Sequence, residues 1–264
     1  MTLIAMISAK GSPGVSTAAL AFTLTWPAPV LLAECDPAGG DLLAGYLARY
    51  ELPPDRGVLP LASSALRGTA DADLTGNLID LDAPCQQRMA LPGLTEPAQS
   101  ASLNMAWTAL GEFFSRMTSR TVLADCGRLA AAHPPWSLLS QADLVLLAVR
   151  PHSLRTVSPA VSALSALRRQ LPPGFVEQSV GLLLVGGGIP AREVARHLGT
   201  PVAATLPWDP QTAAALCGDG RGRRRAPLMR HGAAAYDTIT ELIAARSVAG
   251  ALSRRDTEPL PVTS

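Results

Sequence analysis

Short apolar runs recur along the chain, and segments of helical character separate them. The runs cover residues 2–8, 30–33, 121–124, 142–149, 180–185 and 201–206. Most are apolar at consecutive positions rather than at alternate ones, which is typical of strands buried on both faces of a parallel sheet. Parallel strands need long crossover connections, and the helical segments between the runs can supply them. The alternation therefore predicts a doubly wound α/β domain with a mainly parallel sheet.

Helices are expected between and after these strands. They cover residues 16–24, 42–48, 102–117, 153–171, 190–198 and 233–252. Residues 53–83 mix proline, glycine and acidic residues, and only a helix beginning near residue 63 is expected there. No internal repeat or domain boundary is visible in the sequence. One domain is expected over residues 1–250, followed by a disordered tail over residues 251–264.

The composition allows a full apolar core and excludes several classes of protein. Hydrophobic residues make up 48% of the chain and the formal net charge is +1, which removes a general electrostatic argument for coating nucleic acid. The four cysteines include no C-x-x-C pair, so neither a zinc ribbon nor a disulfide framework is expected. No transmembrane run or signal peptide is recognisable. We expect a cytoplasmic protein, with peripheral association with membrane or nucleoid left open.

The first apolar run ends in a glycine-containing turn that leads directly into a helix. The turn reads Lys10-Gly-Ser-Pro-Gly14, and Val15, Ser16 and Thr17 follow it. Backbone N–H groups converge in such a turn, and the helix N-terminus adds the positive end of its dipole, so the segment suits a phosphate group. A hydroxyl of Ser16 or Thr17 can ligate Mg²⁺. The alternative is an ordinary strand-to-helix turn in which the serines cap the helix.

Lys10 is the only lysine among the 22 basic residues, all the others being arginine. In such a chain, arginine would be an easy replacement wherever only a positive charge is needed. A lysine beside a glycine turn therefore indicates a narrow position that takes a compact ammonium rather than a planar guanidinium. The alternative is a surface lysine without a role.

The turn from Lys10 to Thr17 resembles the deviant Walker A motif K-G-G-x-G-K-S/T-T of the MinD/ParA superfamily, P-loop ATPases that position cellular cargo. Further segments resemble that family in the same order along the chain. They are residues 31–40 (a strand ending in D-x-D-P-x-x-G, with Glu34 in place of the first Asp), 122–127 (the Walker B strand), 142–151 (the next strand) and 198–210 (L-G-x-P-V followed by P-x-D). The resemblance covers residues 1 to about 245 and implies a P-loop NTPase fold. Within the superfamily, the chain looks most similar to CpaE/TadZ-like pilus-assembly proteins and to actinobacterial MinD-like proteins.

The resemblance implies ATP and Mg²⁺ as ligands and a homodimer that encloses them. It implies that Lys10 reaches across the dimer to the partner's nucleotide and that Asp36 orients the attacking water. It places Mg²⁺ beside Ser16, Asp36 and Asp125. It assigns nucleotide contacts to Lys10, Gly11, Ser12, Pro13, Gly14, Val15, Ser16 and Thr17, with Pro207 and Asp209 near the adenine.

Two positions depart from the family pattern. Val15 stands where the family has a second lysine, which lies on the β- and γ-phosphates and stabilises charge in the transition state. Losing that contact is expected to weaken binding by roughly 1.5–3 kcal/mol and to slow hydrolysis. The adenine-binding asparagine is also missing, because glycines occupy residues 186–188. Hydrolysis is therefore expected to be weak or to depend on a partner.

A basic cluster forms the other candidate binding feature. It comprises Arg221, Arg223, Arg224, Arg225, Arg230 and His231. The cluster can contact DNA, an anionic membrane or an acidic partner, and the alternative is a solvated loop. No aromatic residue lies among the arginines, so stacking on single strands is not indicated.

Three functions are compatible with the sequence. The leading hypothesis is an ATP-dependent dimerising switch that positions or assembles a cargo, in partitioning, pilus or secretion assembly, or a septum-type role, through an unidentified cargo or activator protein. The second is a non-hydrolysing pseudo-ATPase scaffold of the same fold. The third is a small-molecule ATP-dependent ligase-type enzyme, which the lack of an evident substrate domain disfavours.

Overall fold

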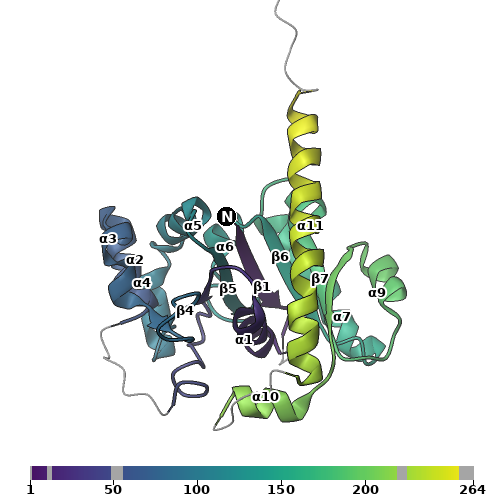
Figure 1. The fold of residues 1–264 in the computed structure, drawn as a ribbon. Coiled ribbons are helices and arrows are strands. Elements are labelled where there is room, and N and C mark those ends of the chain that lie inside the picture. Colours follow the sequence, from purple (N-terminus) through teal and green to yellow (C-terminus); the bar gives the residue numbers. More distant parts are fainter. Residues whose placement is uncertain (1, 11–13, 49–55, 219–224, 256–264) are drawn as a thin grey trace, which may run out of the picture.

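Six apolar strands form the centre of one sheet in the computed structural model, which describes residues 2–10, 14–48, 56–218 and 225–255. They are β1 (Leu3–Ser8), β2 (Val30–Glu34), β5 (Thr121–Arg128), β6 (Leu144–Val149), β7 (Val180–Val185) and β8 (Val202–Leu206). Every residue of β1, β2, β6 and β7 is buried, as expected for strands covered on both faces. The predicted doubly wound α/β fold is confirmed (Figure 1).

Two short strands extend this sheet at one edge. They are β3 (Ile79–Asp80) and β4 (Arg88–Leu91), and over the described residues the strand order is β3-β4-β2-β5-β1-β6-β7-β8. Neighbouring strands are parallel except for β3 and β4. The chain builds outward from β1 in both directions, so the order reverses beside that strand. In open α/β sheets, ligands bind at the carboxyl ends of the strands near such a reversal.

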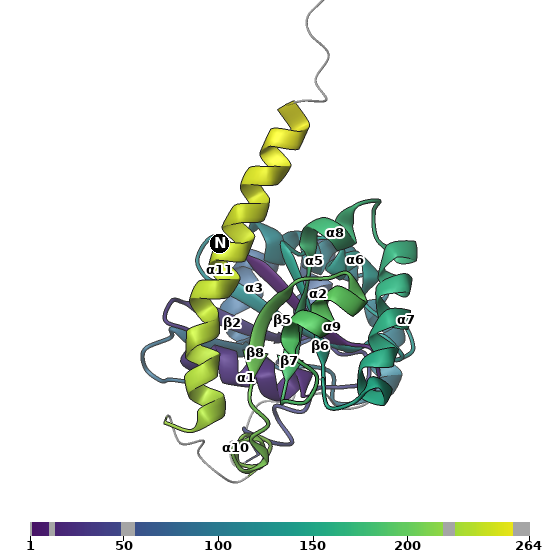
Figure 2. The same cartoon turned by 90° about the vertical axis from the view of Figure 1, so that its right-hand side faces the viewer.

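Helices cover both faces of the sheet. One face carries α1 (Val15–Thr25) and α11 (Pro227–Arg255), whose apolar residues pack together with Ile4 and Met6 of β1. The opposite face carries α2 (Val58–Arg67), α5 (Trp107–Arg116), α7 (Leu154–Gln170) and α9 (Ala191–Leu198). Figure 2 shows α11 and α7 on opposite sides of the strands, with the last turns of α11 extending beyond the sheet. No helix within the described residues is both long and apolar enough to cross a membrane.

Several helix predictions need correction. Residues 42–48 form successive turns instead of a helix, because their hydrogen bonds change span: Gly45 N–H bonds to Asp41, Leu47 N–H to Leu42 and Ala48 N–H to Gly45. The predicted helix 102–117 is divided into α4 (Ser100–Leu103) and α5 by a turn over residues 104–106.

Short elements account for most of the other differences. The sequence analysis missed α3 (Ala70–Asn77), β3, α6 (Trp136–Leu139), α8 (Phe175–Ser179) and α10 (Pro210–Leu216). Elements this short have too few turns for a periodic pattern to stand out. The last helix is also longer than predicted, beginning at Pro227 and continuing to Arg255, so that residues 251–255 of the expected tail are helical. Residues 256–264 lie outside the described residues.

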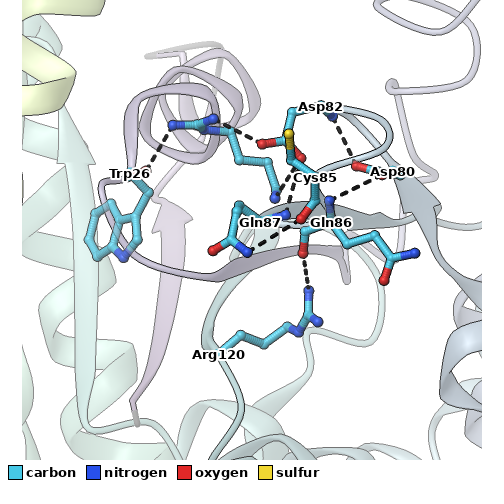
Figure 3. Close-up of polar contacts among 8 residues, drawn as sticks. Trp26, Asp80, Asp82, Cys85, Gln86, Gln87 and Arg120 are labelled. Carbon is cyan, nitrogen blue, oxygen red and sulfur yellow. Dashed lines mark hydrogen bonds and ion pairs between the residues drawn. The ribbon is translucent and has the colours of Figure 1, made fainter.

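Carboxylates fix the hairpin between β3 and β4 (Figure 3). Asp80 accepts the N–H groups of Asp82 and Gln86 at 3.0 and 3.2 Å. Asp82 accepts the N–H groups of Gln87 and Arg88 at 3.2 and 3.1 Å and forms a 3.0 Å ion pair with the Arg88 guanidinium. Arg88 pairs with the first residue of β2, so this network lies at the end of the sheet opposite the strands' carboxyl ends. It is a structural feature of the edge hairpin.

Candidate functional site

A cavity of about 410 Å³ opens at the carboxyl ends of β1, β2 and β5. Its lining residues come from the start of α1, the turns after β2, the end of β5 and residues 216–217 beside α10. The volume lies within the range of about 300–1,000 Å³ typical of small-molecule sites. The cavity therefore occupies the edge of the sheet at which this architecture places ligands.

The first turn of α1 forms one wall without a capping side chain. Gly14 is the N-cap residue, with φ 93° and ψ 35°, and no side chain caps the helix. The N–H groups of Val15, Ser16 and Thr17 have no hydrogen-bond acceptor among the described residues. The N-cap position itself is a glycine and not a serine, while Ser12 lies outside the described residues. N–H groups at a helix N-terminus that borders a cavity suit an anion.

Ser16 and Asp125 both line the cavity. Asp125 is 3% exposed and accepts the Gly127 N–H at 3.0 Å. Burial raises the pKa of Asp125 to about 6, against the lowering effects of the Ser16 side chain and the Gly127 N–H. A buried carboxylate costs free energy unless a cation or donors compensate it. This acid is therefore suited to a bound cation beside the Ser16 hydroxyl.

Asp36 follows β2 and lies against the end of β5. Its Oδ1 accepts the Ala38 N–H at 2.7 Å. A Cβ at Gly127, whose φ is +64°, would overlap the Asp36 carboxylate. Burial raises the pKa of Asp36, while the Ala38 hydrogen bond and the charge of Arg128 lower it. The structure thus brings Ser16, Asp36 and Asp125, which the sequence analysis grouped around Mg²⁺, into one cavity.

Glu34 holds the turn that carries these groups. Its Oε1 accepts the N–H groups of Asp41 and Leu42, both at 2.8 Å, and its Oε2 accepts the Gly93 N–H at 2.9 Å. A Cβ on Gly40 would lie 2.5 Å from Oε2, so glycine is needed for this approach. Burial raises the pKa of Glu34 to about 7 despite the three donors. Glu34 therefore fixes the segment between β2 and the cavity mouth.

The remaining residues predicted for the site either do not line this cavity or lie outside the described residues. Lys10 is exposed in a bend after β1 and does not line the cavity. Gly11, Ser12 and Pro13 lie outside the described residues. Asp209 does not line the cavity either: it is the N-cap residue of α10 and accepts the Thr212 N–H at 3.0 Å and the Leu228 N–H at 3.3 Å. Pro207, two residues earlier, also lies outside the lining.

Arg128 and Cys217 also line the cavity, and the sequence did not identify them as site residues. Arg128, the last residue of β5, lines the cavity; its place directly after Asp-Cys-Gly was the available signal. Cys217 lines it from the far side, with its Sγ 3.6 Å from the Thr17 Oγ1. No sequence pattern indicated Cys217, because it is 200 positions from Thr17 in the sequence and contacts it only in the folded chain.

The acids of the cavity do not form a self-sufficient metal site. Among the described residues, no group of three or more His, Cys, Asp or Glu side chains is arranged to hold a metal ion. Mg²⁺ is commonly held by one or two carboxylates together with substrate phosphates and water. A hydroxyl, a buried carboxylate and the N–H groups of a helix N-terminus in one cavity fit Mg²⁺ bound to a polyphosphate better than a bare ion.

Solved structures share this fold. The septum site-determining protein MinD complexed with Mg-ADP, from Pyrococcus horikoshii OT3, has a TM-score of 0.70 at 15% identity, over 93% of this chain and 98% of that one. A ParA family ATPase from Chlorobium tepidum TLS gives 0.71 at 14% identity, over 88% and 96%. The chain has the fold of the MinD/ParA ATPases. The MinD of the Aquifex aeolicus MinC:MinD cell division protein complex gives 0.67 at 14% identity, over 100% and 99%.

The resemblance to MinD/ParA proteins is thus confirmed at the level of the fold. No protein-family model matches the chain, and no curated protein sequence does. TM-scores of 0.70 and 0.71 at 14–15% identity establish a shared fold, while fold alone does not fix function. The function must be argued from the residues of the cavity, and the CpaE/TadZ-like placement stays a prediction.

The two buried acids predict an unusual pH dependence for the protein without Mg²⁺. The pKa values of Glu34 and Asp125 are raised by burial to about 7 and about 6. A carboxyl group whose pKa is higher in the folded state than in the unfolded state stabilises the protein most at pH values below its unfolded-state pKa. This contribution is lost as the pH rises through the folded-state pKa. The free energy of unfolding should therefore fall between about pH 4 and about pH 7. Urea denaturation in EDTA measures it, with Asp125→Asn expected to flatten the decline. A free energy that rises over this range in both proteins would contradict the assignment.

Proposed function

We propose that the protein is an ATP-binding switch that binds Mg²⁺-ATP in this cavity, dimerises around it and positions a cellular cargo. The placement of Ser16 and the buried Asp125 in one cavity with the N-terminus of α1 carries the proposal. An anion site and a cation site lie side by side there, as a Mg²⁺-nucleotide requires. The shared fold with a MinD complexed with Mg-ADP supports the same ligand.

Each residue then has a defined task. The N–H groups of Val15, Ser16 and Thr17 bind phosphate oxygens, and the Ser16 hydroxyl with Asp125 holds Mg²⁺, which neutralises charge on the phosphates when bound. Asp36 accepts a hydrogen bond from a water molecule and orients it, since only its Oδ1 is engaged by a backbone donor. Glu34 holds the turn after β2 in place.

Positions 10 and 15, which both carry lysine in the MinD/ParA motif, affect nucleotide binding and hydrolysis differently in this chain. Val15 is 6% exposed and lines the cavity, so the first turn of α1 presents an apolar side chain where a phosphate would lie. Lys10 is exposed outside this cavity, which is compatible with an action on the nucleotide of a second subunit. We therefore propose that ATP supports dimerisation, whereas hydrolysis is weak or requires a partner.

The proposed cargo is of the kinds that MinD/ParA proteins position. Partitioning, septum placement and pilus or secretion assembly are the candidate processes, and the MinC:MinD complex is an example of such a fold with a protein partner. We propose a cytoplasmic protein that binds peripherally to its target. Arg225 is exposed before α11, while Arg221, Arg223 and Arg224 lie outside the described residues; contact of this cluster with DNA or an anionic membrane stays a prediction.

A non-hydrolysing scaffold is the second candidate, and Val15 is the observation that favours it. Both candidates bind ATP, so turnover separates them. In the scaffold, no phosphate is released in the presence of Mg²⁺-ATP even when the protein dimerises. In the switch, slow release depends on Lys10 and Asp36.

Cysteine modification tests nucleotide binding at the proposed place. Cys217 is exposed and lines the cavity, Cys85 is exposed in the β3–β4 hairpin, and Cys35 and Cys126 are buried. At an ATP concentration ten times the Kd, Mg²⁺-ATP should slow maleimide labelling of Cys217 about tenfold, because only about one molecule in ten has an empty site. Labelling of Cys85 should not change and serves as the internal control. Peptide mass spectrometry measures both rates; equal Cys217 rates with and without millimolar Mg²⁺-ATP would rule out binding in this cavity.

A further inference from the structure

The charges around the cavity are unbalanced for a polyphosphate ligand. Among the described residues that line it, Glu34, Asp36, Asp41 and Asp125 are acidic, and Arg128 is the only basic one. Phosphate oxygens placed beside four carboxyl groups are repelled unless cations intervene. Mg²⁺ can supply one compensating charge centre. The other available centre is the Arg128 guanidinium.

The backbone of Arg128 is fixed beside the phosphate-binding turn. Arg128 pairs with Ser8, the last residue of β1, in the parallel ladder between β5 and β1. The next residue, Leu129, donates its N–H to the Ser8 carbonyl at 2.9 Å. Since Ala9 and Lys10 follow Ser8 directly, the ladder holds Arg128 level with the end of β1. Its side chain and that of Val15 line the same cavity.

The guanidinium is available for a ligand. Arg128 is exposed, and no hydrogen bond or ion pair engages its side chain within the described part of the chain. Its charge acts through space on Asp36, whose pKa it lowers against the effect of burial. Asp36 is therefore close enough to sense the charge without being paired with it.

We propose that Arg128 contacts the phosphates of the bound nucleotide and supplies, from the end of β5, the positive charge that Val15 cannot supply from α1. The inference rests on the proposed function, because it concerns the same Mg²⁺-ATP site. A guanidinium binds two phosphate oxygens at once in a fixed planar geometry. Arg128 is then a binding residue that holds the phosphates, and it explains how a cavity with four acids and no P-loop lysine retains a polyphosphate.

The test compares the Kd of Mg²⁺-ATP for the wild type, Arg128→Gln and Arg196→Gln, measured by calorimetry on the full chain. Arg196 is an exposed arginine of α9 without a polar contact among the described residues, so it controls for the loss of one surface charge. Arg128→Gln should weaken Mg²⁺-ATP binding roughly ten- to hundredfold, as expected for losing a charge-assisted contact. Arg196→Gln should bind as the wild type does. Equal Kd values for the two variants would overturn the inference.

A compensating variant distinguishes a phosphate contact from a structural role. Restoring the positive charge on the opposite wall, in the double variant Val15→Lys with Arg128→Gln, should recover at least tenfold of the lost affinity. Recovery is not expected if Arg128→Gln only damages the fold, and a lowered thermal midpoint without recovery would overturn the proposal. Failure of the wild type to bind Mg²⁺-ATP would instead overturn the proposed function itself, and this inference with it.

Discussion

Replacing Asp125 with asparagine should remove most Mg²⁺-ATP binding while leaving the ligand-free protein at least as stable as the wild type. The carboxyl group is 3% exposed and its pKa is raised to about 6 by burial, so its charge destabilises the fold at neutral pH in the absence of a cation. Asparagine keeps the shape and can still accept the Gly127 N–H through its carbonyl oxygen. What it loses is the negative charge beside Ser16. The Asp125 carboxylate therefore lowers the stability of the ligand-free protein and favours binding of the Mg²⁺-nucleotide.

Thermal unfolding with and without Mg²⁺-ATP measures both effects. At an ATP concentration 100 times the wild-type Kd, binding stabilises the wild type by about 2.7 kcal/mol, which corresponds to a shift of about 5–10 °C. If the variant binds roughly a hundredfold more weakly, the stabilisation falls to about 0.4 kcal/mol. The midpoint without ligand should stay the same or rise.

Asp82→Asn is the matched control, because the same substitution should give the opposite pattern. Asp82 accepts two backbone N–H groups and pairs with Arg88 at the far end of the sheet. Losing that charge should lower the ligand-free midpoint and leave the ATP-induced shift intact. A variant of Asp125 that retains the full ATP shift would contradict its role as the cation ligand.

The sequence predicted the central strands because their burial on both faces leaves a local signature. Runs such as 180–185 are apolar throughout and could not be mistaken for a half-exposed edge strand. The grouping of Ser16, Asp36 and Asp125 came from the resemblance to MinD/ParA proteins, and it agrees with the rule that the carboxyl ends of neighbouring parallel strands meet. Strand ends were less certain: β5 continues four residues past the predicted end, so that Asp125 lies within the strand.

Features formed between distant segments were not predictable. Glu34 accepts hydrogen bonds from the N–H groups of residues that lie seven and 59 positions later in the chain. No spacing in the sequence predicts hydrogen-bond partners of this kind. The chain after β2 packs against Cys217 at Gly45, where a Cβ would lie 2.9 Å from the carbonyl oxygen of Cys217. The glycine therefore allows the close approach that places Cys217 at the cavity. Asp209 was assigned to the adenine from a motif, and its capping contacts with Thr212 in α10 were not part of that prediction. Motifs identify residue types, while the contacts that use those residues depend on the assembled fold.

Replacing Gly127 with alanine should be the most destabilising single change at the cavity. Its φ of +64° disfavours any side chain, and a Cβ would also overlap the carboxylate of Asp36. Gly199, the C-cap residue of α9, has a nearly identical φ of +61° but has open space around its would-be Cβ. Gly199→Ala should therefore cost about 1–2 kcal/mol from backbone strain alone, and Gly127→Ala about 1–3 kcal/mol more from the overlap.

A double-mutant cycle isolates the contact between the two residues. In an Asp36→Ala background the overlapping carboxylate is gone, so Gly127→Ala should cost no more than Gly199→Ala does in the wild type. The free energies of unfolding from urea denaturation then give a coupling of about 1–3 kcal/mol between positions 36 and 127. Purely additive costs would show that Asp36 does not lie against Gly127 in solution. The acid would then lose the contact that places it beside the end of β5, and its proposed task of orienting water would have no geometric basis.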